Sequence, residues 1–214
     1  MINEQRGQPV FIPADSVTLE GTLVLPRGAK GVVLFAHGSG SGRFSPRNKF
    51  VAEVLNKGQI GTLLIDLLTA EEDADSKKRF DIGLLTRRVK AAVQWVQEQP
   101  DMDALPVGLF GASTGAAAAL KAAAHVGPTI RAVVSRGGRT DLAQEDLPRV
   151  RAPTLLIVGS KDEFVLRLNQ ESYRALKAAK GIEVVSGATH LFEEPGALEE
   201  VADLAAKWFT DHFP

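Results

Sequence analysis

The stretch GLFGASTGAAAALKAAA, residues 108–124, decides the fold, because an apolar run passes through two glycines into an alanine-rich run. Ser113 stands midway between Gly111 and Gly115. Glycine is unfavourable inside helices and strands, so this pair indicates a turn with an unusual backbone. The pattern predicts a buried strand over residues 105–111 and a helix over 113–125, joined by a sharp turn at the serine. The alternative is an ordinary glycine-rich turn without a chemical role.

The same alternation of strand and helix extends from this stretch in both directions. Continuous apolar runs indicate strands buried on both faces, and runs with helical spacing indicate helices between them. This order predicts the α/β class, with a mostly parallel sheet that helices cover on both faces. We expect eight strands, of which the second is antiparallel. The expected strands are 10–12, 17–25, 31–38, 60–68, 105–111, 130–135, 153–159 and 181–187, and the expected helices are 46–57, 81–99, 113–125, 169–179 and 199–213.

Two polar connections, residues 69–80 and 137–152, follow expected strands and should lie as loops at the carboxyl edge of the sheet, where ligands bind. Neither is long enough to form a separate cap domain. We also expect Gly58 to end the helix over 46–57.

Composition and charge exclude several classes of protein. The 214 residues suit one domain, 44% are hydrophobic and 24% are charged, as in an ordinary globular protein. A formal net charge of −1 argues against nucleic-acid binding, and the lack of cysteine excludes disulfides and thiolate sites. The first residues lack the pattern of a signal peptide, and no apolar run reaches the ~18 residues of a membrane span. We therefore expect a cytoplasmic protein without membrane contact, as a monomer or homodimer.

The candidate nucleophile is Ser113. The pentapeptide over residues 111–115 matches G-x-S-x-G, with the strand before it and the helix after it that this motif requires. In such a turn the hydroxyl projects from the edge of the sheet, and the helix N-terminus favours developing negative charge. A serine alone is a weak nucleophile, so it needs a base and a group that orients the base.

The chain offers four histidines as the base. His37 ends an expected strand, where a structural role is expected. His125 ends the helix after the serine, and His212 lies close to the C-terminus. His190 lies in the loop after the last expected strand, at the carboxyl edge, and is the candidate base.

The orienting group should be a carboxylate after another strand. Asp162 follows the expected strand over 153–159, and the chain order Ser113, Asp162, His190 is the one found in α/β-hydrolases. Glu163 and Asp141 are the alternatives, because the first is adjacent and the second follows the preceding strand.

An acyl-transfer site also needs two N–H donors for the oxyanion. The N–H of Thr114 is one candidate, and the loop HGSGSGR, residues 37–43, offers Ser39 or Gly40 as the other. The alternative reading of this loop as a phosphate-binding loop fails, because it lacks both G-K-[ST] and G-x-G-x-x-G.

Gly40, Arg43 and Arg136 are candidate substrate-binding residues. Arg43 follows the oxyanion loop, and Arg136 follows a carboxyl-edge strand together with Arg139. These arginines are expected either to attract an anionic part of the substrate or to be solvated loop residues.

Taken together, these segments make the chain resemble the α/β-hydrolase superfamily, and within it the small, cap-less dienelactone hydrolase-like branch. The segments that carry the resemblance are HGSGSGRFSPRN, FGASTGAAAAL, VVSRGGRTDLA, TLLIVGSKD and GATHLFEEPGALEEVA. Similar domains are sometimes joined to a phosphoribosyltransferase domain. The resemblance implies a single α/β-hydrolase domain over residues 1–214, with a triad of Ser113, Asp162 and His190. Dienelactone hydrolases carry a cysteine nucleophile, which this chain lacks, so dienelactone is not the expected substrate. No phosphoribosyltransferase domain accompanies the hydrolase segments in this sequence, so the resemblance implies nothing about nucleotide binding.

The expected activity is that of a serine esterase. It would cleave carboxylic esters of small, accessible substrates through an acyl-enzyme, without a metal or cofactor. The same triad would serve a thioesterase or an amidase, and a non-catalytic binding module on this fold is the alternative from another class.

Overall fold

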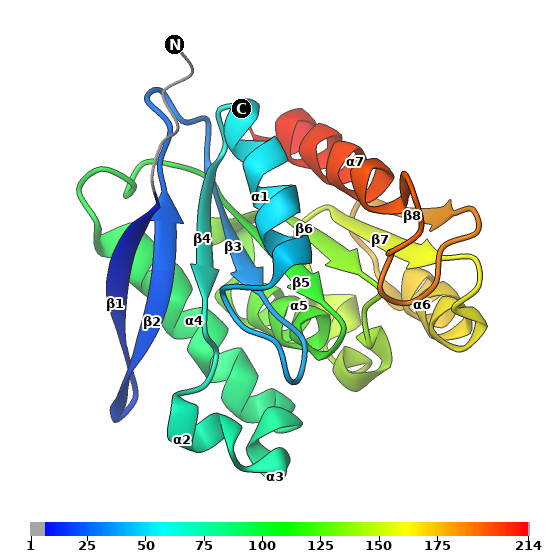
Figure 1. The fold of residues 1–214 in the computed structure, drawn as a ribbon, viewed down its shortest axis with the longest axis horizontal. Coiled ribbons are helices and arrows are strands. Elements are labelled where there is room, and N and C mark those ends of the chain that lie inside the picture. The colour runs from blue at the N-terminus through cyan, green and yellow to red at the C-terminus, as the bar shows by residue number, and fades with distance from the viewer. Residues whose placement is uncertain (1–6, 214) are drawn as a thin grey trace.

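The computed structural model describes residues 7–213 and contains one eight-stranded sheet in the order β1-β2-β4-β3-β5-β6-β7-β8 (Figure 1). The first three strands in this order pair antiparallel and the others pair parallel. This confirms the expected α/β-hydrolase architecture without a cap domain, including the antiparallel second strand. The strands are β1 (Gln8–Ala14), β2 (Val17–Val24), β3 (Val32–Ala36), β4 (Gly61–Ile65), β5 (Val107–Ala112), β6 (Ile130–Arg136), β7 (Thr154–Gly159) and β8 (Lys180–Val185).

Helices cover both faces of the sheet, as Figure 1 shows. The first and last long helices pack side by side on one face, and the other three long helices cover the opposite face. The α-helices are α1 (Pro46–Lys57), α2 (Ala70–Asp73), α3 (Ser76–Arg79), α4 (Ile82–Glu98), α5 (Thr114–Val126), α6 (Glu163–Ala175) and α7 (Ala197–His212). Short 3-10 turns occupy Gly127–Thr129, Thr140–Ala143 and Leu147–Arg149.

The central strands are mainly apolar because both of their faces are buried. Every residue of β3, β4, β5 and β7 is buried. The alanines of α5 are buried as well, and their small side chains let this helix approach the sheet closely. The strands therefore form a rigid base whose carboxyl ends carry the loops of the site.

Three elements differ from the sequence-based expectation. Helix α6 begins at Glu163, whereas the sequence predicts a start at residue 169. The prediction misses the first turns because the buried positions of this helix include the polar residues Asn169 and Ser172, which obscure the apolar periodicity. The expected loop over 69–80 contains α2 and α3, and Thr69 caps the first of these with a capping box. Gly58 caps α1, but the left-handed residue beside it is Gln59, with φ 60°.

The turn between β5 and α5 requires both of its glycines. A Cβ atom at Gly115 would lie 2.2 Å from the carbonyl oxygen of Ala36, and one at Gly111 would lie 2.4 Å from the Cα of Ala116. Both distances are far inside van der Waals contact, and the obstacles are backbone atoms. The glycines thus allow α5 to start directly against β3 and β5.

Ser113 occupies the tip of this turn with a strained backbone, φ 51° and ψ −122°. Its N–H donates to the carbonyl of Arg136 at 3.2 Å, and its carbonyl accepts from the N–H of Arg139 at 3.0 Å. The end of β6 therefore holds the serine in this conformation.

His37 connects the ends of β3 and β4. The N–H of Leu67 donates to its Nε2 at 3.0 Å, so Nε2 carries no proton, and Nδ1 donates to the carbonyl of Gly38 at 2.9 Å. Burial lowers the pKa of His37 below its usual 6.5, although the Gly38 carbonyl and the Asp66 carboxylate act in the opposite direction. His37 is therefore a neutral structural residue, as its position in the sequence predicts.

We predict that Gly115→Ala destabilises the fold by about 1–3 kcal/mol or more, because backbone atoms must move to admit the methyl group. Urea unfolding measures the change. Gly83→Ala in α4 is the matched control and should change the stability by less than about 1 kcal/mol, since that glycine is exposed and helical. Equal losses in both variants would contradict the crowding at the turn.

We predict that His37 makes the protein less stable in acid. The unfolded chain takes up a proton on this histidine near pH 6.5, whereas the folded chain does so only at lower pH. Stability is therefore lost as the pH falls below 6.5, by up to about 1.4 kcal/mol per pH unit. His37→Gln keeps an acceptor for the Leu67 N–H but does not titrate, so urea midpoints between pH 7.5 and 5.5 should fall less steeply than in the wild type. The same slope in both proteins would refute the prediction.

Candidate active site

The structure brings Ser113, Asp162 and His190 to the carboxyl edge of the sheet. Ser113 follows β5, Asp162 lies just beyond β7, and His190 lies in the connection between β8 and α7. Parallel strands end at the same edge, so residues far apart in the sequence meet there.

Asp162 and His190 form a short hydrogen bond. The Nδ1 of His190 lies 2.6 Å from the Oδ2 of Asp162, and the carboxylate is mostly buried whereas the imidazole is 38% exposed. Asp162 precedes α6, but its side chain caps none of the helix N–H groups. The carboxylate is thus available to fix the ring, with Nδ1 as the donor and Nε2 free to accept a proton.

The backbone after β6 adjoins both Ser113 and His190, and Gly38 packs against the serine. A Cβ atom at Gly137 would lie 3.4 Å from the ring of His190, and one at Gly38 would lie 3.0 Å from the Cβ of Ser113. Gly137 also follows Arg136, whose carbonyl accepts from the Ser113 N–H. The nucleophile and the base therefore flank the same short piece of backbone after β6.

The hydrogen bonds of residues 7–213 do not include one between Ser113 Oγ and His190 Nε2. Such bonds are often long in the absence of substrate and shorten in the reacting complex.

The alternative bases and acids have other partners. His125 lies 3.2 Å from Asp146, and the Nδ1 of His212 donates to the carbonyl of Trp208 at 2.7 Å. Asp141 is bound by Arg139 at 2.8 Å. Glu163, which is exposed, is the first residue of α6. Asp162 is the carboxylate that contacts His190.

The two expected oxyanion donors lie side by side, but one of them has an internal partner. The Ser39 N–H donates to the Oγ1 of Thr114 at 2.9 Å. The Ser39 hydroxyl donates to the carbonyl of Arg79 at 3.0 Å and also lies 3.0 Å from Thr114 Oγ1. The Ser39 N–H becomes available to another acceptor when the Thr114 hydroxyl turns away.

The candidate substrate-binding residues differ from one another. Gly40 has a left-handed backbone, φ 71°, with open space where a side chain would be. Arg43 is bound by the carboxylates of Asp66 and Glu20, so its charge is neutralised. Arg136 is buried and joins no salt bridge of the described residues, a combination that the sequence does not reveal.

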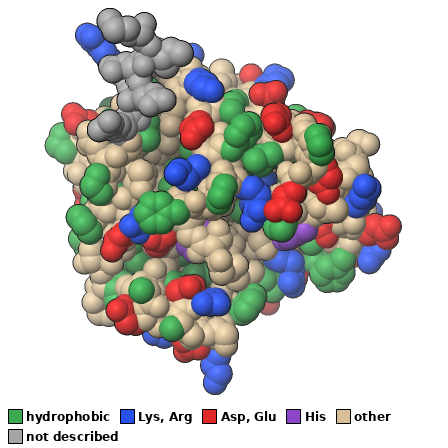
Figure 2. Space-filling model, in the orientation of Figure 1, with side chains coloured by type: hydrophobic (Ala, Val, Ile, Leu, Met, Phe, Trp, Pro, Cys, Tyr) green, Lys and Arg blue, Asp and Glu red, His purple; other side chains and the backbone are tan. Residues whose placement is uncertain are grey.

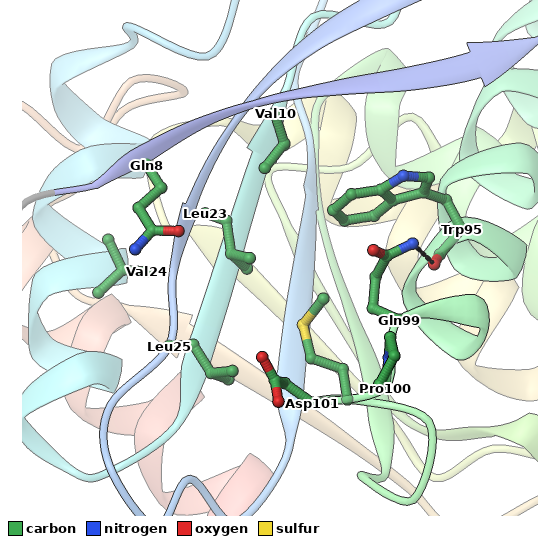
Figure 3. A pocket seen from close by; sticks show the side chains of 10 residues that line it. Gln8, Val10, Leu23, Val24, Leu25, Trp95, Gln99, Pro100 and Asp101 are labelled. Atoms are coloured by element: carbon green, nitrogen blue, oxygen red, sulfur yellow. Dashed lines mark hydrogen bonds between the residues drawn. The ribbon is translucent and has the colours of Figure 1, made fainter.

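A cavity of about 590 Å³ lies elsewhere, at the opposite edge of the sheet. Figure 3 shows Trp95 of α4 and Gln99, which follows this helix, facing residues of β1 and β2. The Gln99 amide donates to the Trp95 carbonyl at 2.9 Å. The cavity contains none of the three triad residues. Within residues 7–213 no helix is long and apolar enough to cross a membrane.

Comparison with known proteins gives three informative relatives. A dienelactone hydrolase from Anabaena variabilis is 51% identical, covers 99% of this chain and 100% of its own, and superposes with a TM-score of 0.95. The esterase Pf2001 of Pyrococcus furiosus shares the fold, with 20% identity, coverage of 97% and 93%, and a TM-score of 0.82. A putative phosphoribosyl transferase of Mycobacterium tuberculosis is 54% identical over 207 residues.

The third relative is longer than this chain. The match covers 97% of the present chain but 47% of the relative, so the chain spans about half the length of the curated protein. Residues 20–213 match the dienelactone hydrolase family. With the sheet, the strained serine turn and the carboxyl-edge loops in place, the chain belongs to the dienelactone hydrolase family, as its resemblance implies.

Proposed function

We propose that this protein is a serine hydrolase that cleaves carboxylic esters of small, accessible substrates. The observation that carries the proposal is the 2.6 Å bond between Asp162 and His190 beside the strained Ser113. An imidazole held by a carboxylate through Nδ1, with Nε2 facing a serine hydroxyl, is the arrangement that activates a serine.

In the first step, Ser113 Oγ attacks the ester carbonyl while His190 Nε2 takes the hydroxyl proton. Asp162 holds the ring tautomer and balances the imidazolium that forms. The N–H of Thr114, at the start of α5, stabilises the oxyanion together with the N–H of Ser39 or Gly40. His190 then returns the proton to the alcohol as it leaves.

In the second step, His190 removes a proton from water, which attacks the acyl-enzyme. The tetrahedral intermediate collapses, the acid leaves, and Ser113 recovers its proton from His190. The exposed imidazole ring gives water direct access. A site without a cap suits small substrates better than long acyl chains, which need apolar cover.

The comparisons support hydrolysis by family membership, and the choice of an ester rests on the geometry of the site. The phosphoribosyl transferase name belongs to a relative of about twice the length. We do not extend it to these residues, because they match the hydrolase family from residue 20 to residue 213.

We predict that a fluorophosphonate probe forms one covalent adduct with the wild type and none with Ser113→Ala. The probe reports an activated serine without requiring the natural substrate. Intact-mass spectrometry measures the adduct, and circular dichroism shows that both proteins are folded. A folded wild type that stays unlabelled would overturn the proposed function.

We predict that Asp162→Asn lowers kcat for 4-nitrophenyl acetate by roughly 10²–10⁴-fold, because the amide favours the wrong imidazole tautomer. Asp141→Asn is the matched control and should retain kcat within about threefold, since Asp141 binds Arg139 and not His190. Similar losses in the two variants would reject Asp162 as the orienting carboxylate.

A further inference from the structure

Arg136 is a buried cation without an ion-pair partner among residues 7–213. It ends β6 and is only 8% exposed, yet its Nε and Nη1 atoms have no hydrogen-bond acceptor among the described residues. Its guanidinium lies 5.9 Å from the centre of the Phe192 ring, which offers weak compensation at most. Burying an unpaired charge costs free energy, and a bound anion would offset this cost at Arg136.

A second arginine adds positive charge near Arg136 and so strengthens the attraction for an anion. Arg47, the second residue of α1, is close enough to repel Arg136. Burial, followed by this repulsion, lowers the pKa of Arg136 to about 10, so the group remains charged at neutral pH. Arg47 itself reaches only the largely exposed carboxylate of Glu193, at 3.0 Å.

Another buried arginine of the same chain has hydrogen-bond acceptors for its guanidinium, as expected for a structural residue. Arg88 is even less exposed than Arg136, but it binds the carboxylate of Glu72 at 3.0 Å and the carbonyl of Ala14. The fold thus provides a carboxylate for Arg88, whereas the described part of the chain provides none for Arg136.

The backbone of Arg136 adjoins two residues of the proposed triad, and its guanidinium lies near Phe192. The Arg136 carbonyl accepts from the Ser113 N–H, and the next residue, Gly137, packs against the His190 ring. Phe192 lies two residues beyond the histidine. Figure 2 shows acidic and basic side chains interspersed over the face that α1 and α7 cover, so the attraction for an anion is local and not a property of the whole surface.

We propose that Arg136, assisted by Arg47, binds an anionic group of the substrate, either a carboxylate or a phosphate. This inference rests on the proposed function and narrows it to esters that carry a negative charge close to the scissile bond. A guanidinium forms paired hydrogen bonds with either anion, which restores the two missing acceptors of Arg136.

The test compares three 4-nitrophenyl esters that share a leaving group: the neutral acetate, the hemisuccinate with a carboxylate, and the phosphonoacetate with a phosphonate. We expect the wild type to have a higher kcat/KM for at least one anionic ester than for the acetate. The anionic ester with the higher kcat/KM shows whether the site prefers a carboxylate or a phosphate. In Arg136→Met the ratio of kcat/KM for anionic to neutral ester should fall about 10- to 100-fold.

Two further variants test whether a change in this ratio is specific to the proposed anion site. Arg131→Met changes an exposed arginine at the other end of β6 and should leave the ratio unchanged. Arg47→Gln should lower the ratio less than Arg136→Met does. If Arg136→Met fails to fold, a lowered ratio in Arg47→Gln supports the anion site and an unchanged ratio overturns it. The melting temperature of Arg136→Met should equal or exceed that of the wild type, whereas a structural arginine would lower it.

Calorimetric titration with succinate and with inorganic phosphate tests the subsite apart from catalysis. Wild-type binding that Arg136→Met or Arg47→Gln weakens supports the subsite even if no ester is cleaved, in which case only the proposed function fails. An unchanged ester ratio, or equal losses on all three esters, overturns the subsite while the esterase proposal stands. If no ester is cleaved, failure of the wild type to bind either anion overturns it as well.

Discussion

The close approach of α5 to the sheet is the constraint on which the rest of the site depends. Gly115 lets the helix begin against the carbonyl of Ala36, and this start fixes Ser113 in a conformation that side-chain-bearing residues rarely adopt. The end of β6 then binds the serine backbone on both sides, through Arg136 and Arg139. The strain at one residue is thus supported by the packing of a whole helix.

Much of this arrangement can be predicted from the sequence because it follows from long, regular signals. The buried strands are continuous apolar runs, and the carboxyl-edge rule places Asp162 and His190 near Ser113 without knowledge of any contact. The start of α6 could not be predicted, because Asn169 and Ser172 are buried through hydrogen bonds to Gly138 and Thr140 and not through apolar packing. Such partners come from distant parts of the chain, which local patterns do not encode.

The arginines illustrate the same limit. In the sequence Arg43 and Arg136 look alike, since each follows a strand on a polar, glycine-rich loop. In the structure Arg43 is neutralised by two carboxylates, whereas Arg136 is enclosed without a carboxylate partner among the residues that the structure describes. Whether a guanidinium is available to a ligand depends on which acidic residues the fold brings near it, and this is a property of tertiary packing alone.

The hydrogen bond from Ser39 to Thr114 has a consequence for selectivity between the ground state and the transition state. The N–H that would hold the substrate oxygen is already satisfied by a neutral hydroxyl. A neutral ester carbonyl is a similar acceptor, so exchanging one for the other gains little free energy. A developing oxyanion is a much stronger acceptor and displaces the hydroxyl readily. In the proposed mechanism, the oxyanion would therefore displace the Thr114 hydroxyl whereas the neutral ester would not, so the Ser39 N–H would stabilise the transition state more than the bound substrate.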